Sequence, residues 1–350
     1  MSGLVGHVMY GVLGAKAARQ RKLPVAGIIE RHWASYLCGS YLGCDIQTMP
    51  EAICVETGKE VGYGTAKLEK SPLTGGPVKP WHLEFGGRKY TPREIHTLFY
   101  GRSHLVFGWK GADTQHTVPW DHLDDYVAAA VGDAIELFGP GERKLAYLFG
   151  WACHIVGDSL IKSVRPGVDL ELLGAKYTPR NRPIQDLVTF HDIGRKELGL
   201  NWVDLFADLA ATPVEPAQVH YMRAGRPRGR LGETFANAWE PALEPLLLTV
   251  LAENRRYQQI RNGRLLKQLA LKKTRVGWQC DEELSGIAGG LSYAEMLEAA
   301  DKADFRHALW QMGEAVADLF ERVVERQPLL QDFPVGDGPG WEELTGRWKG

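Results

Sequence analysis

The 350-residue sequence is poor in cysteine, contains no long apolar run and carries almost no net charge. Its five cysteines form no Cys-x-x-Cys pair, and this odd, scattered set is a poor disulfide framework and a poor structural zinc site. No stretch approaches the roughly 20 apolar residues that a transmembrane helix needs, so we expect no membrane span. The 41 basic residues nearly balance the 43 acidic ones, which argues against nucleic acid as the main partner.

The first residues lack the basic region followed by an apolar region that marks a secretory signal peptide. We therefore expect a cytoplasmic protein, or a secreted one if a signal was removed from a precursor. The odd cysteine count agrees with a reducing compartment. With 44% hydrophobic and 24% charged residues, the composition is that of an average globular protein, which excludes disordered, collagen-like and coiled-coil classes.

Apolar residues recur at helical spacing over most of the chain. The helices predicted in this way span residues 4–20, 24–43, 119–138, 142–164, 184–199, 201–211, 232–271 and 293–327. Residues 56–93 are instead rich in Gly, Pro, Lys and Thr, and we expect a long irregular segment there, with a small hairpin near the alternating sequence WHLEF. The pattern as a whole predicts an all-α fold.

The most informative segment is the apolar helix predicted over residues 142–164, because it contains His154 and Asp158. Residues four apart leave the same face of a helix, one turn from each other. Burying an imidazole and a carboxylate costs several kcal/mol each unless they are paired or bound to a metal. Two interpretations follow: a hydrogen-bonded His–Asp pair in a core, or a metal-binding face, since both side chains are good zinc ligands.

Other candidate metal-ligating residues lie at predicted helix ends and loop edges. They are His7, Asp45, His104, and the adjacent pair His191 and Asp192. Taken singly, an exposed histidine or a loop aspartate is a weak signal. Several such residues beside one buried His-x-x-x-Asp helix favour a shared metal site.

Four short motifs, taken in chain order, resemble those of the zinc-dependent phospholipase C / P1 nuclease superfamily, which includes the amino-terminal domain of glycosylphosphatidylinositol phospholipase D. SGLVGH, ending at His7, is similar to the family's amino-terminal stretch, and GSYLGCD, ending at Asp45, resembles its glycine-containing turn. Ser103 followed by His104 resembles the next ligand segment. LFGWACHIVGD, with His154 and Asp158, is the closest local match. The resemblance covers roughly residues 2–200.

This resemblance implies a multi-helix bundle with long irregular loops, in which residues 1–210 form a metal-binding core. Residues 211–350 would be a helical extension packed on the same domain. The implied cofactor is a cluster of one to three zinc ions, although such ligands also bind manganese or iron. The implied ligands are His7, Asp45, His104, His154, Asp158, His191 and Asp192. Asp45 would bridge metals and orient the attacking water in phosphoric ester hydrolysis.

Two positions depart from the family pattern. Lys162 stands where the family has another histidine, and Arg195 stands where an acidic residue would follow His191. One of the family's usual three metal sites therefore lacks ligands that the family pattern expects. The Lys162 ammonium can hold a phosphate as a point charge, which makes it a second candidate catalytic residue.

Alternatives to a phospholipase C-like phosphodiesterase remain open. One is a different enzyme on the same scaffold, in which Lys162 and a reduced metal site act on a small metabolite; the missing signal peptide and the odd cysteine count favour it, because the familiar hydrolases are secreted. His191-Asp192-Ile-Gly is similar to the central motif of HD-domain phosphohydrolases, with His154 as the earlier histidine. A non-catalytic helical binding protein is the third class.

The partners expected under the leading hypothesis are substrates that contain phosphate: a small molecule, a lipid or a nucleic acid. The two long amphipathic helices predicted over residues 232–271 and 293–327 would complete the core or form a homodimer interface.

Overall fold

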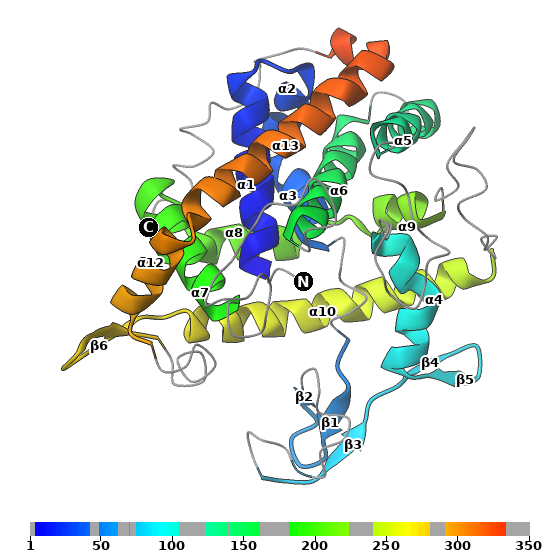
Figure 1. Cartoon of the computed structure of the whole chain (residues 1–350). Coiled ribbons are helices and arrows are strands. Elements are labelled where there is room, and N and C mark those ends of the chain that lie inside the picture. The colour runs from blue at the N-terminus through cyan, green and yellow to red at the C-terminus, as the bar shows by residue number, and fades with distance from the viewer. Residues whose placement is uncertain are drawn as a thin grey trace.

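The computed structural model describes residues 4–42, 49–61, 70, 75–104, 123–138, 141–161, 182–223, 241–280 and 291–333. This part of the chain is mostly helical, with three small antiparallel sheets at its periphery (Figure 1). The predicted all-α class is therefore confirmed. No helix in the described segments is long and apolar enough to cross a membrane.

A central bundle of helices contains most of the apolar core. Its members are α1 (Leu4–Gln20), α2 (Pro24–Arg31), α3 (Trp33–Leu42), α5 (Leu123–Phe138), α6 (Glu142–Ile161) and α13 (Phe305–Arg326). The sequence of α1 carries no charged side chain before Lys16, and nearly all of its residues are buried, including His7. A helix that is apolar all round is typical of the interior of a bundle.

Around this bundle lie shorter elements and one long helix. They are α4 (Pro92–His104), α7 (Arg182–Leu187), the π-helix η4 (Val188–Glu197), α8 (Trp202–Ala211), α9 (Glu215–Arg223), α10 (Leu243–Gln268), α12 (Tyr293–Lys302) and the 3₁₀-helix η6 (Pro328–Asp332). In Figure 1, α10 runs along one side of the bundle.

The helices α3 and α6 touch through their backbones at two glycines. A Cβ atom at Gly39 would lie 2.0 Å from the carbonyl oxygen of Tyr147, and one at Gly150 would lie 1.8 Å from that of Tyr36. No other residue allows so close an approach, since only glycine lacks the Cβ atom. The pair therefore fixes how near α3 lies to α6.

The helix α13, near the end of the described chain, lies against α1, near its start (Figure 1). A Cβ atom at Gly313 would lie 2.9 Å from the backbone of Leu13, so the two helices also pack closely. At the surface, Arg21 bonds to Glu314 and Asp318 of α13 at 2.5 and 2.6 Å. Such exposed pairs add little stability, and the buried apolar contacts hold the two helices together.

Helix breaks were the main errors of the sequence-based prediction. The helix predicted over 24–43 is divided at His32, whose backbone leaves the helical region. The one predicted over 293–327 is divided before Phe305, because Asp304 adopts a left-handed conformation with φ of 50°. The one predicted over 184–199 consists of α7 and the π-helix, and the long helix predicted over 232–271 spans only Leu243–Gln268 in the described residues.

The strands are short and lie outside the bundle. A three-stranded sheet has the order β2 (Glu60–Val61), β1 (Ala52–Cys54), β3 (Val78–Pro80). The hairpin predicted near WHLEF is confirmed as β4 (Leu83–Phe85) and β5 (Arg88–Tyr90), joined by Gly86 and Gly87, both with positive φ. Such a two-glycine turn matches the twist of a hairpin. A second hairpin, β6 (Lys272–Thr274) and β7 (Gly277–Gln279), follows α10 and was not predicted.

The α3–α6 contact leads to a stability prediction. Gly150→Ala should lower the free energy of unfolding by about 3 kcal/mol, because the methyl group must push the α3 backbone away. Gly263→Ala is the control, because its Cβ would meet no atom within 4 Å on the exposed face of α10. Alanine there should be neutral or stabilising by up to about 1 kcal/mol. Equal urea unfolding midpoints for the two variants would contradict the close contact.

Candidate metal centre

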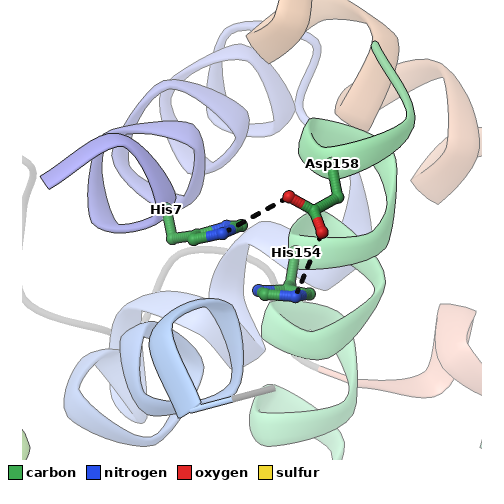
Figure 2. Close-up of side chains that lie close together, drawn as sticks. All are labelled: His7, His154 and Asp158. Carbon is green, nitrogen blue, oxygen red and sulfur yellow. Dashed lines mark ion pairs between the residues drawn. The ribbon is translucent and has the colours of Figure 1, made fainter. Parts of the chain in front are cut away.

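Three of the predicted ligands meet between α1 and α6. His7 lies in the second turn of α1, and His154 and Asp158 lie one turn apart on α6, as their spacing predicted. All three side chains are buried in the apolar bundle, with residue exposures of 3%, 0% and 6%. Figure 2 shows the His7 ring reaching from α1 toward the carboxylate of Asp158.

The donor atoms of these residues lie close together. His7 Nε2 is 3.5 Å from Asp158 Oδ1, and His154 Nε2 is 4.0 Å from Asp158 Oδ2 (Figure 2). The two imidazole rings stack with their centroids 4.0 Å apart and their planes inclined by 18°. One ligand atom from each residue falls within 4.8 Å of the others, so the three form a compact donor group.

A backbone contact from α3 orients one of the histidines. His154 Nδ1 lies 2.9 Å from the carbonyl oxygen of Ser40, and it must donate because a carbonyl only accepts. In the neutral ring, Nε2 then carries the lone pair and faces Asp158. A metal-binding histidine is commonly oriented in this way by an acceptor on its other nitrogen. The Ser40 hydroxyl donates to the carbonyl of His7, so this one residue links α1, α3 and α6.

The residue types suit a zinc ion. Ligands 2.0–2.1 Å from a tetrahedral zinc lie about 3.4 Å from one another, whereas His7 and His154 face different oxygens of Asp158 at 3.5 and 4.0 Å. The two stacked rings would have to tilt for both Nε2 lone pairs to point at one ion. Two neutral imidazoles and one carboxylate are a common zinc donor set and leave a fourth position for water or substrate. The same three side chains can also form a carboxylate paired with a protonated histidine, which is the other interpretation of a buried His–Asp helix.

Cys153 precedes His154 but is not a nucleophile. The residue is completely buried, and burial raises the pKa of its thiol to about 12. Nucleophilic cysteines need the thiolate near neutral pH and partial exposure. The chemistry of the cluster therefore rests on nitrogen and oxygen donors.

Several other predicted site residues fall outside the described part of the chain. Asp45 and Lys162 lie in segments that the structure does not describe. His104 is the last residue of α4, and its side chain also lies outside the described atoms. Their roles as ligands or catalytic groups stay predictions.

The structure describes His191 and Asp192, and both make their contacts with residues outside the cluster of His7, His154 and Asp158. His191 Nε2 donates to the carbonyl oxygen of Leu269 at 2.7 Å, and burial lowers the pKa of this imidazole. Asp192 accepts hydrogen bonds from Arg306 and, at 3.4 Å, from Lys196. The structure therefore brings together His7, His154 and Asp158 and leaves this pair apart from the group.

The contribution of Ser40 was missed from the sequence. Ser40 contacts His154 through its backbone carbonyl oxygen. Every residue has this group, so the residue type at position 40 could not indicate the contact. The neighbouring Gly39 within an apolar helix was the available hint, because an interior glycine marks close approach of another element.

In comparisons with protein-family models, curated proteins and solved structures, none matched the chain. The function is therefore inferred from the residues and geometry of the protein itself.

The cluster predicts metal binding that mutation can remove. The purified protein, loaded with zinc and dialysed, should retain at least one zinc per chain, and Asp158→Asn should lower that occupancy at least tenfold because the amide loses the anionic ligand. Asp124→Asn is the matched control, since Asp124 is equally buried but pairs with Arg326. Elemental analysis measures the zinc. A wild-type protein that retains none would identify the cluster as a structural His–Asp pair.

Proposed function

We propose that this protein is a metal-dependent hydrolase that acts on phosphoric esters, in the manner of the phospholipase C / P1 nuclease superfamily that its motifs resemble. The observation that carries the proposal is the buried cluster of His7, His154 and Asp158. These residues come from the first and the fourth of the four matching motifs, about 150 positions apart in the chain. These residues lie far apart in the sequence and close together in the structure. This favours a shared site over a chance match of short motifs.

Each residue of the cluster has a definite part in this proposal. His7 and His154 offer Nε2 as neutral ligands, and the Ser40 carbonyl holds His154 in the required tautomer. Asp158 supplies negative charge between them. When bound, zinc acidifies a water molecule toward neutral pH and neutralises charge on phosphate oxygens.

The predicted residues outside the three-residue cluster are proposed to complete the site. Asp45 is the proposed bridging carboxylate, His104 a further ligand, and Lys162 a contact for a phosphate oxygen. Under this proposal the centre holds one to three zinc ions, and the substrate is a phosphate-containing lipid, nucleic acid or small molecule.

A second candidate is a different enzyme on the same scaffold, with fewer metals and a small-metabolite substrate. It is favoured by the contacts of His191 and Asp192. Since His191 donates to Leu269 and Asp192 pairs with Arg306, these two ligands are engaged elsewhere. Arg195 in place of an acidic residue agrees with a reduced site.

Hydrolysis of bis(4-nitrophenyl) phosphate tests the leading proposal. The zinc-loaded protein should release nitrophenol, and Asp158→Asn should reduce kcat/KM at least 100-fold because the metal that activates water is lost. Asp124→Asn, a buried carboxylate outside the cluster, should stay within about threefold of wild type.

Metal content is measured on the same samples, so that loss of activity can be assigned to loss of zinc. A wild-type protein that holds zinc but cleaves neither this diester nor 4-nitrophenyl phosphate would contradict phosphoric ester hydrolysis and favour the second candidate. Activity retained by Asp158→Asn would contradict the assigned site.

A further inference from the structure

A pocket of about 610 Å³ lies between η4, the start of α8, the end of α10, the β6–β7 hairpin and the start of α12. None of the three cluster residues lines it. Its volume is in the range of small-molecule binding pockets, about 300–1,000 Å³. The side chains that form its walls indicate which class of ligand it can bind.

The walls are mainly aromatic and aliphatic. Phe190 and Trp202 stack with ring centroids 5.0 Å apart, and the Trp202 indole nitrogen donates to the Phe190 carbonyl oxygen at 3.2 Å. Gly194 permits this packing, because a Cβ atom there would lie 2.7 Å from the Trp202 ring. Trp278 of the hairpin faces the same pocket and is half exposed. An apolar ligand body would find a prebuilt surface here.

The backbone on one side of the pocket is a ten-residue π-helix, η4. Helical segments of this kind are rare and are frequently found at functional sites. His191, on η4, is tied to the end of α10 by its bond to Leu269. Burial lowers the pKa of His191, so this histidine adds no positive charge at neutral pH.

Two polar side chains, Tyr293 and Arg195, lie among the otherwise apolar walls and could orient a ligand. The Tyr293 hydroxyl is buried and has no hydrogen-bond partner among the described residues. Arg195 lines the pocket and is exposed, and no carboxylate of the described chain lies within ion-pair distance of it. The nearby Asp192 is already paired with Arg306 and Lys196. Positive charge is therefore available at the mouth, beside an apolar interior.

We propose that this pocket binds an apolar monoanion: a hydrophobic body seated against Phe190 and Trp202, with its single negative group held by Arg195. A long-chain carboxylate and an aromatic carboxylate share this chemistry. The guanidinium forms charge-assisted hydrogen bonds with either head group, and the phenol of Tyr293 offers a further donor.

Two fluorescent probes that differ mainly in charge test the role of Arg195. They are 1-anilinonaphthalene-8-sulfonate, which is anionic, and N-phenyl-1-naphthylamine, which is neutral. Both should bind the full-length protein saturably. Arg195→Gln should weaken binding of the anionic probe about tenfold and leave the neutral probe within twofold. Lys196→Gln, which removes the adjacent exposed cation, should change neither probe by more than twofold.

Further variants separate the pocket from the metal centre. Trp278→Ala should weaken both probes, because it removes a wall, whereas Asp158→Asn should change neither. Dodecanoate and 1-naphthoate are then used to displace the anionic probe, and the stronger competitor identifies the ligand body. Far-ultraviolet circular dichroism checks that each variant is folded.

The proposal is overturned if no saturable binding occurs, if Arg195→Gln affects both probes equally or neither, or if neither carboxylate displaces the anionic probe. Failure of zinc binding or of phosphodiester hydrolysis would not bear on this pocket, since it shares no lining residue with the cluster.

Discussion

The close backbone contact between α3 and α6 is the constraint on which the candidate metal centre depends. Gly39 and Gly150 let the two helices approach until the Ser40 carbonyl reaches the His154 ring. A larger residue at either glycine would separate the helices and remove the acceptor that orients this imidazole. The packing of two small residues therefore sets the chemistry of a side chain one turn further along α6.

The sequence predicted most of the helices and part of the site, for identifiable reasons. His154 and Asp158 were found because residues four apart on one apolar helix must share a face. His7 has no such relation to them: on residue type alone it was a weak candidate, and the resemblance of its motif made it an expected ligand. Helix breaks at His32 and Asp304 were missed, because neither position has the Gly or Pro by which a helix end is usually identified in a sequence.

The π-helix η4 shows that apolar periodicity predicts a helix but not its type. Apolar periodicity over residues 184–199 predicted a helix but gave no sign of the change from α to π geometry at Val188. That change accompanies the placement of His191 against Leu269, on a helix more than 70 residues later. The interpretation of His191 and Asp192 as ligands came from the family resemblance. In the structure His191 lines the apolar pocket, and Asp192 pairs with Arg306 and Lys196.

The packing of α13 on α1 also has a consequence for how the protein is made. In the described residues, α13 packs closely on α1 although it lies about 300 positions later, as in the approach of Gly313 to Leu13. At about 5–20 residues per second, roughly 15–60 s of synthesis separate the appearance of these two helices from the ribosome. During that time the contacts of α1 with α13 are missing, although those with α2, α3 and α6 can form. The bundle is therefore expected to complete its folding only once α13 has been made, and chaperones that bind exposed apolar surfaces would assist it until then.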